Sequence, residues 1–487
     1  MWFTHSHQAL PAQTSGQEYD LQYYAIHWLN DDVLLCIFDC YRLDEKNGWN
    51  DRFGWCKLSH VCQRWRYLIY ECAFHLGMRI KCTNGFPIAD MLGHFPPLPL
   101  FVDYGHTRSG VTTTLTEQDE LGIYHALQLH GRVCHIGLSL PPSVLHKVVM
   151  LMDERFPILE YLSLSFSATS ENSLPLTLPK GFLAPNLRHL ALPGISPPRR
   201  LRVLSSTISL VIFELIEVQA SSYFRPRILA ARLRSLPQLE ELSIGFSTPI
   251  PHPSTERELL GVQGAPLTLP SLKILQFKGV GTYLESLAAQ IRAPLLERLL
   301  VTLFNQIAFA LPHLFHLINT TKGFKLPRAT VGFDRTEVFV TVDHSSLTRS
   351  KQYFRLRVIC KPLDWQIDCA AQICHALIPA VSGVEQFRLI CYYSMIPTEW
   401  QNGEIDGTTW HELLRSFIMM KELYIDYRFV EELSRAMQLD EIGSNPEFLP
   451  NLRSISAARN LFTSFIDTRR VVGRPVQFEE YSPGIGL

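Results

Sequence analysis

The sequence has no dominant charge of either sign: 45 lysines and arginines stand against 46 aspartates and glutamates, and the net charge is −1 over 487 residues. This balance gives no global basic field that would attract nucleic acid or anionic lipid, although it allows a local patch. No apolar run reaches the length of about 18 residues that a membrane-spanning helix needs. Residues 1–20 also lack the basic-then-apolar pattern of a secretory signal peptide. We therefore expect a cytoplasmic or nuclear protein that binds neither nucleic acid nor membrane.

Closely spaced cysteine pairs are also missing. The chain has 11 cysteines, an odd number, and none of them forms the Cys-x-x-Cys pair that zinc sites usually contain. Four cysteines and one histidine within residues 36–62 could be metal ligands, but they fall on apolar helical patterns, which favour free thiols. Cys369 and Cys374 lie on a similar pattern, which favours buried thiols. We expect a reducing compartment and no metal or other cofactor.

Catalytic motifs are absent as well. The sequence contains no Gly-x-Ser-x-Gly elbow and no phosphate-binding P-loop. His411 and Glu412 lack the second histidine of a zinc-protease helix, and Gly279 and Gly281 lack the third glycine of a dinucleotide-binding loop. The sequence therefore predicts a protein that is not an enzyme.

What the chain does contain is a recurring phrase, Pro-x-Leu-x-x-Leu-x-apolar. Copies that keep the proline span residues 157–164, 185–192, 237–244, 270–277, 294–301 and 450–457. Weaker copies without it span residues 210–215, 384–389 and 420–425. The first apolar positions of the first six copies are 159, 187, 210, 239, 272 and 296, so the copies lie 23 to 33 residues apart. A phrase that recurs at this spacing is typical of repeat proteins.

The phrase ends in an alternation of period two, which predicts a short strand with one buried face. Residues 144–156 have apolar side chains at helical spacing, and Pro157 ends that pattern. One strand and one helix cannot bury their own apolar faces, whereas stacked units share a core. The phrase resembles leucine-rich repeats in an irregular form, and this implies a solenoid; the alternative is a large α/β domain whose strands follow prolines. Residues 338–342 and 354–358 also alternate and predict strands outside the repeat phrase.

Two amphipathic patterns lie within residues 21–82. Asn30 is suited to cap a first helix, and Asp31 and Asp32 favour the positive end of its first turn. The first apolar stripe is Val33, Leu34, Ile37, Phe38 and Tyr41, and the second is Trp55, Leu58, Val61, Cys62 and Trp65, extended by Leu68 and Ile69. A unit of about 45 residues cannot bury both stripes internally, so we expect a partner.

This segment resembles an F-box. The family pattern is Leu-Pro, then Ile-Leu or Ile-Phe, a variable turn, and Leu-x-x-Val-Cys-x-x-Trp-Arg. Leu29, Ile37-Phe38 and residues 58–66 match it, whereas Asn30 replaces the family proline and the turn at residues 42–53 is longer and charged. An N-terminal F-box followed by irregular leucine-rich repeats also resembles a large group of fungal F-box proteins.

The resemblance implies a substrate-recognition adaptor. Family members bind Skp1 through the F-box, are joined by it to a cullin–RING ubiquitin ligase, and hold a protein substrate on their repeats, which raises the local concentration of substrate lysines. By family position the F-box core and the Skp1-facing surface are formed by Leu29, Val33, Leu34, Ile37, Phe38, Leu58, Val61, Cys62 and Trp65. The sequence leaves open which of these face Skp1 and which face inward. The alternative is a non-catalytic leucine-rich-repeat scaffold with a degenerate F-box, or with a Skp1 complex that lacks cullin.

Basic residues gather at two places in neighbouring repeats. Arg199, Arg200 and Arg202 form one cluster, and Arg232 and Arg234 belong to the other. They fit either a solvated helix face or a patch for an acidic or phosphorylated substrate segment, because the guanidinium fork matches phosphate.

The predicted organisation is thus an α/β protein with a small helical domain followed by repeats. We expect a loose tail over residues 1–20, the F-box and a following helix over 21–82, a connector and first repeat or cap over 83–130, an irregular leucine-rich-repeat-like solenoid over 131–470, and a C-terminal tail over 471–487.

Overall fold

The computed structural model comprises two compact units. Unit 1 contains residues 1–81 and 89–101, and unit 2 contains residues 82–88 and 102–487. The structure describes residues 28–43, 54–72, 76–77, 79–85, 92, 97–105, 115–167, 176–196, 204, 207–249, 266–304, 311–321, 324, 326–344, 352–360, 363–392, 407–442 and 448–481. The predicted tail over residues 1–20 lies outside these ranges.

Unit 1 contains three helices in its described part: α2 (Asp31–Leu43), α3 (Gly54–Ser59) and α4 (Gln63–Glu71). The side-chain oxygen of Asn30 accepts the N–H of Val33 at 2.9 Å, which confirms Asn30 as the cap of α2. Two aspartates occupy the first turn of that helix, where the helix dipole favours negative charge.

The second amphipathic pattern does not form one helix, and that prediction is wrong. The chain leaves the helical conformation between α3 and α4, and the backbone of Cys62 is extended, with φ −159° and ψ 172°. The sulfur of Cys62 accepts the N–H of Trp65 at 3.5 Å, so this cysteine is the N-cap of α4. Because the cap interrupts the helical periodicity, Val61 does not share the inner face of its neighbours.

Unit 2 is built on one large, mostly parallel sheet. Its strands are β3 (Val133–Leu140), β4 (Tyr161–Phe166), β5 (His189–Ala191), β6 (Ile212–Val218), β7 (Glu241–Phe246), β9 (Ile274–Gly279), β11 (Arg298–Phe304), β14 (Tyr353–Ile359), β13 (Glu337–Asp343), β12 (Arg328–Asp334), β15 (Gln386–Cys391), β16 (Glu422–Ile425), β17 (Ser454–Ala457) and β18 (Gln477–Glu480), in this spatial order. β1 (Ile80–Cys82) and β2 (Leu100–Tyr104) lie at the boundary of the two units, and β8 (Leu267–Thr268) pairs with β10 (Ile291–Arg292). Every strand predicted from the repeat phrase is present.

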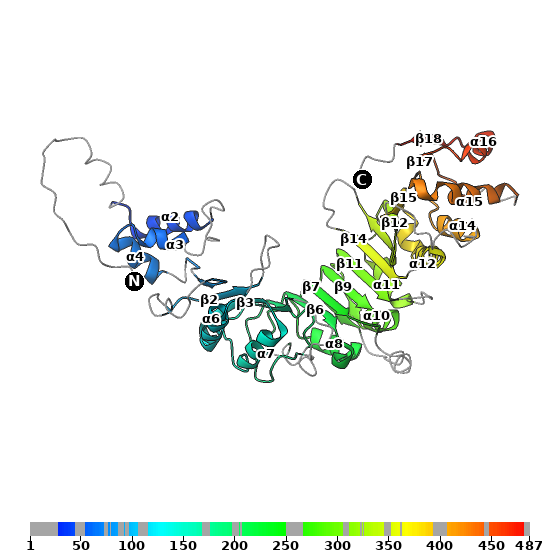
Figure 1. The fold of residues 1–487 in the computed structure, drawn as a ribbon. Coiled ribbons are helices and arrows are strands. Elements are labelled where there is room, and N and C mark those ends of the chain that lie inside the picture. The colour runs from blue at the N-terminus through cyan, green and yellow to red at the C-terminus, as the bar shows by residue number, and fades with distance from the viewer. Residues whose placement is uncertain are drawn as a thin grey trace, which may run out of the picture. The chain divides into compact units, whose positions relative to one another are not determined.

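Helices follow the strands and cover one face of the sheet (Figure 1). They are α6 (Glu117–Gln128), α7 (Pro142–Leu151), α8 (Pro226–Leu233), α10 (Gly281–Ala288), α11 (Pro312–Thr320), α12 (Leu363–Ala376), α13 (Ile378–Val381), α14 (Gly407–Arg415), α15 (Val430–Ile442) and α16 (Thr463–Val471). Alternate residues of β11, β14 and β15 are buried, and those between them are only partly buried. The buried set faces the helices and forms the core, so the opposite face of the sheet is open. The α/β prediction is confirmed at this level.

Each full copy of the repeat phrase begins with a hydrogen-bonded turn. The N–H of Leu159 donates to the carbonyl of Phe156 at 3.4 Å, around Pro157. The same bond closes the turns at Leu187, Leu239, Leu272, Leu296 and Leu452. Proline presets the backbone at the second position of such a turn, and the leucine that closes it is buried in every copy. The phrase therefore encodes a turn followed by a strand.

In three of the copies that keep the proline, the residue after it ties the turn to the preceding one. The amide of Asn186 donates to the carbonyl of Pro157 at 2.7 Å, and the hydroxyl of Ser271 donates to the carbonyl of Pro237 at 3.0 Å. The amide of Asn451 likewise donates to a carbonyl one turn back, at 3.0 Å. These bonds link neighbouring units outside the strand ladder.

Two parts of unit 2 depart from the predicted organisation. An antiparallel hairpin, β12–β13, stands between parallel strands, because β13 pairs antiparallel with both β12 and β14. Strands at residues 338–342 and 354–358 are confirmed, whereas β12 was not predicted. Residues 471–487, which we expected to form a loose tail or a terminal cap, contain β18, which pairs in parallel with β17 at the end of the sheet.

The ten cysteines whose side chains the structure describes are all free, and Cys369 and Cys374 are buried on α12, as expected. In the same ranges no helix combines the length and the apolar character that crossing a membrane would require.

Candidate binding surfaces

The nine N-terminal residues that the sequence analysis selected differ in how far they are exposed to solvent. Leu34, Phe38 and Leu58 are buried, Leu29, Cys62 and Trp65 are half-buried, and Val33, Ile37 and Val61 are exposed by 42%, 41% and 54%. The apolar stripe of α2 therefore divides into an inner row and an outer row.

The inner row is closed by contacts between α2 and α4. The rings of Phe38 and Trp65 pack edge to face, with centroids 4.9 Å apart. Arg64 donates to the carboxylate of Asp31 at 2.7 Å and to the carbonyl of Leu29 at 2.6 Å. These contacts fix the two helices against each other, so the outer row stays on the surface.

Trp28 and Tyr67 are also exposed in this unit, by 82% and 65%. Sequence reasoning did not select either residue as a contact residue. An aromatic ring on a surface that already carries exposed valine and isoleucine is characteristic of protein interfaces.

A second candidate surface is the open face of the sheet in unit 2. Five arginines occupy positions on this face, and we call them the arginine face: Arg298, Arg328, Arg355, Arg357 and Arg388. All five are partly buried, and they alternate with core residues along their strands. The alternation Phe-Arg-Leu-Arg-Val in residues 354–358 was the signal that could have revealed them.

Arg355 and Arg357 follow each other on this face of β14. The Nε of Arg355 donates to the hydroxyl of Thr341 at 3.0 Å, and its guanidinium lies 5.3 Å from the centroid of the Phe339 ring. The Nε of Arg357 lies 3.3 Å from a carboxylate oxygen of Glu337. Each guanidinium is thus oriented by a neighbour on β13.

Arg328 and Arg388 extend the face across β12 and β15. Arg328 donates to the amide oxygen of Gln386 at 2.9 and 3.1 Å. Arg388 lies 5.9 Å from the centroid of the Tyr424 ring, and Tyr424 in turn stacks on Tyr481 at 4.8 Å. The aromatic rings support this arginine, and the carboxyl groups of Asp343 and Glu422 act on it electrostatically.

Burial governs the charge of the acidic groups on this face. Desolvation raises the pKa of Asp343 above the usual aspartate range, even though Arg328, Arg388 and Arg355 act to lower it. Desolvation likewise raises the pKa of Glu337, against the effect of Arg357. The arginines keep their charge over the physiological range, so protonation of these carboxyls makes the face more positive.

A hollow of about 280 Å³ adjoins the arginine face. Gly245 lies at its floor, Ile216 and Ile359 contribute apolar walls, and Lys278 and Arg357 contribute positive charge. A Cβ on Gly245 would meet only ordinary contacts, the nearest at 3.5 Å.

The arginines that the sequence selected are described only in part. Arg199, Arg200 and Arg202 lie outside the described residues. Arg232 and Arg234 lie at the C-terminal end of α8, in the helical layer, where Arg232 is partly buried and Arg234 is exposed. The prediction that both clusters form one patch stays a prediction.

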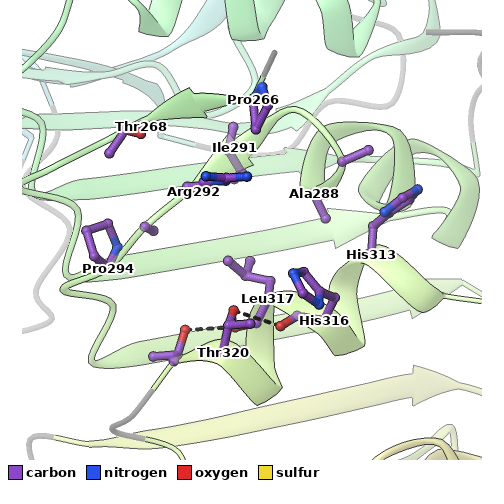
Figure 2. A pocket seen from close by; sticks show the side chains of 13 residues that line it. Pro266, Thr268, Ala288, Ile291, Arg292, Pro294, His313, His316, Leu317 and Thr320 are labelled. Carbon is purple, nitrogen blue, oxygen red and sulfur yellow. Dashed lines mark hydrogen bonds between the residues drawn. The ribbon is translucent and has the colours of Figure 1, made fainter. Parts of the chain in front are cut away.

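A cavity of about 440 Å³ lies between β10 and α11 (Figure 2). Arg292, His313 and His316 give it polar lining, and Ile291 and Leu317 give it apolar lining. The N-terminal N–H groups of α11 do not offer an anion-binding site to this cavity, because the carboxylate of Glu285 on α10 already accepts the N–H groups of His313 and Leu314.

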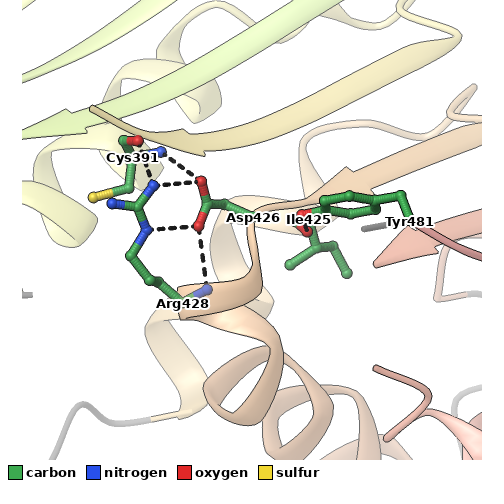
Figure 3. A network of polar contacts seen from close by, with 5 residues as sticks. All are labelled: Cys391, Ile425, Asp426, Arg428 and Tyr481. Atoms are coloured by element: carbon green, nitrogen blue, oxygen red, sulfur yellow. Dashed lines mark hydrogen bonds and ion pairs between the residues drawn. The ribbon is translucent and has the colours of Figure 1, made fainter. Parts of the chain in front are cut away.

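A buried ion pair joins the ends of β15 and β16 (Figure 3). Arg428 and Asp426 form two parallel bonds of 2.7 and 2.8 Å, with side chains only 9% and 14% exposed. Arg428 also donates to the carbonyl of Cys391 at 2.6 Å, and the hydroxyl of Tyr481 donates to the carbonyl of Ile425 at 2.7 Å. These bonds are structural, because they connect successive strands.

Within the described ranges no three histidine, cysteine, aspartate or glutamate residues are arranged to hold a metal ion. The side chain of Cys56 lies outside the described part of the chain, so this statement covers only the other cysteines of residues 36–62. No protein-family model and no curated protein matches the chain.

Proposed function

We propose that the protein is the substrate-recognition adaptor of a Skp1–cullin–F-box ubiquitin ligase. In this proposal unit 1 is an F-box that docks Skp1, and unit 2 is an irregular leucine-rich-repeat-like solenoid that holds a protein substrate. Repeated units of turn and strand, linked from turn to turn by asparagine and serine side chains, support the solenoid interpretation.

One observation carries the proposal for unit 1. Val33, Ile37 and Val61 are exposed while the inner side of the same helices is filled by Leu34 and Phe38. Helices that keep branched apolar side chains in solvent gain stability when a partner covers them, at about 25 cal/mol per Å² of apolar surface.

The test uses the full chain and purified Skp1. We expect wild type to capture Skp1 and Ile37→Asp to lose capture by at least about tenfold, because a carboxylate would be desolvated in the apolar contact. Leu121→Asp is the matched control, since Leu121 is 56% exposed on α6 in unit 2.

Two results would reject the adaptor proposal. Wild type that fails to capture Skp1 would indicate that Asn30 and the long turn have disabled the F-box, and the non-catalytic scaffold would replace it. Capture of Skp1 without recruitment of cullin in a three-component assay would favour a Skp1 complex outside the ligase.

A further inference from the structure

The open face of the sheet offers a substrate-binding surface whose chemistry the arginine face defines. It combines Arg328, Arg355, Arg357 and Arg388 with three carboxyl groups, those of Asp334, Glu337 and Asp343. Three of these arginines, Arg328, Arg355 and Arg388, act electrostatically on the carboxyl of Asp343. Positive charge is therefore in excess over the strands β14, β13, β12 and β15.

The spacing of the arginines indicates the kind of anion that would match them. Neighbouring strands lie about 4.8 Å apart, so Arg355 on β14 and Arg388 on β15 are separated by about 14 Å across the sheet. Arg355 and Arg357 lie about 7 Å apart along one strand. A distance of about 14 Å is the reach of four to five extended residues.

The contacts of each arginine argue against a single phosphate as the ligand. Arg355 is held by Thr341 and Phe339, Arg357 by Glu337, and Arg388 by a tyrosine ring. These guanidinium groups are oriented by different neighbours, and the backbone positions of Arg355 and Arg388 lie about 14 Å apart, although both groups also act on the carboxyl of Asp343. Several carboxylates spread along a chain fit this arrangement better than one dense anion.

Threonines occupy the positions between Arg355 and Arg388 on this face of the sheet. Thr341 and Thr330 are paired across β13 and β12, and Thr330 is paired with Arg388 across β12 and β15. Gly332 continues this row, and the ring of Phe339 lies over it, because a Cβ at Gly332 would come within 2.0 Å of that ring. Thr341 is buried beneath Arg355, whose Nε donates to its hydroxyl, so a segment that crosses β13 at this position would meet the guanidinium of Arg355.

We propose that the arginine face binds an acidic, unphosphorylated segment of a protein substrate, laid across β14, β13, β12 and β15. This proposal names the substrate class of the proposed adaptor. Only the ubiquitylation of the bound protein rests on the adaptor proposal. Binding itself needs neither Skp1 nor unit 1. Charge complementarity between separated guanidinium groups and separated carboxylates supplies both attraction and register.

The experiment measures the anisotropy of a fluorescein-labelled poly-Asp peptide titrated with the full chain at low salt. We expect saturable binding that weakens steeply as salt is added. The Arg355→Gln/Arg388→Gln variant should bind about tenfold more weakly, and Arg388→Gln alone about threefold more weakly, because each exposed ion pair contributes modestly. The contact that holds Arg388 is with the ring of Tyr424, so its single variant separates binding from folding.

The matched control is Arg232→Gln/Arg234→Gln on α8. It removes two positive charges from the helical layer, as many as Arg355→Gln/Arg388→Gln removes from the sheet. We expect it to change the affinity for poly-Asp less than twofold. Equal weakening by both double variants would overturn the proposal, because it would reduce the effect to net charge. Absence of poly-Asp binding to wild type would overturn it as well.

Two further arms separate this proposal from its neighbours. A peptide of glycine and serine with one phosphoserine should bind more weakly than poly-Asp, and tighter binding would replace the acidic segment with a phosphorylated one. The Ile37→Asp variant should bind poly-Asp like wild type. Loss of Skp1 capture with intact peptide binding would reject the F-box docking alone, and the reverse result would reject the arginine face alone.

Discussion

A buried carboxylate in the helical layer gives the most quantitative prediction. Glu285 lies on α10 with only 7% of its surface exposed. Its two carboxylate oxygens accept the N–H of His313 at 2.5 Å and the N–H of Leu314 at 3.1 Å, in the first turn of α11. The glutamate therefore caps the helix of the following unit. We expect Glu285→Ala to loosen α11 specifically.

The magnitude follows from the groups that the substitution leaves behind. A hydrogen bond to a charged acceptor contributes about 1.5–3 kcal/mol, and loss of an N-cap costs about 0.5–2 kcal/mol. Two N–H groups lose their acceptor in Glu285→Ala, of which the N–H of Leu314 lies in a buried contact. We take about 3 kcal/mol as the loss of local stability, and Glu285→Gln should cost about 1 kcal/mol because it keeps one acceptor oxygen.

Hydrogen exchange followed by mass spectrometry measures this loss locally. A loss of about 3 kcal/mol corresponds to about a hundredfold faster exchange in peptides that cover α11, at about 1.4 kcal/mol per tenfold. Peptides from α15 should be unaffected. Glu154→Ala, at an exposed position, is the control. Unchanged exchange of α11 in Glu285→Ala would refute the capping role.

Three other predictions concern the sheet. Asp426→Ala should lower the free energy of unfolding by about 3 kcal/mol, measured by urea denaturation, because Arg428 would stay buried without its counter-charge. Gly332→Ala should cost about 2 kcal/mol in the same assay and weaken poly-Asp binding, because a Cβ would displace the ring of Phe339 that lies over it. Affinity for poly-Asp should rise as the pH falls from neutral into the acidic range, because burial raises the pKa of Asp343 and its protonation removes a negative charge from the arginine face. The raised pKa also means that this carboxyl favours folding at low pH and loses that contribution as the pH rises through its folded-state pKa.

Each of these predictions has a control in the chain. Asp467→Ala breaks an ion pair with Arg470 whose side chains are mostly exposed, and the urea midpoint should not change. Gly383→Ala adds a Cβ that meets no atom within 4 Å, so it should be neutral. Asp343→Asn should reduce the pH dependence of peptide binding, and the Asp343→Asn/Glu337→Gln variant should reduce it further, because burial also raises the pKa of Glu337.

The repeat phrase predicted the strands well because it encodes local geometry. Proline presets the turn, the closing leucine enters the core, and the alternation that follows suits a strand with one buried face. The cap at Asn30 was predictable for the same reason, since the bond to Val33 spans three residues. Features that depend on neighbours in sequence could be read from the sequence.

Features that depend on pairing between distant segments could not be read from the sequence. The reversal at β13 follows from its pairing with β12 and β14, and no local pattern distinguishes an antiparallel strand from a parallel one of the same alternation. The break before α4 was missed because cysteine is a weak cap, and its sulfur was interpreted as an apolar member of a stripe. The arginine face was missed because arginines that are distant in sequence meet only through strand register.

The alternation along the strands has a consequence for how such a protein can change over evolutionary time. Along β14, the residues Phe354, Leu356 and Val358 face the helices, while the arginines between them face solvent. Substitutions in the second set alter what the surface attracts and leave the packing of the first set intact. A chain built in this way can acquire a new ligand one exposed position at a time, without passing through variants that fail to fold.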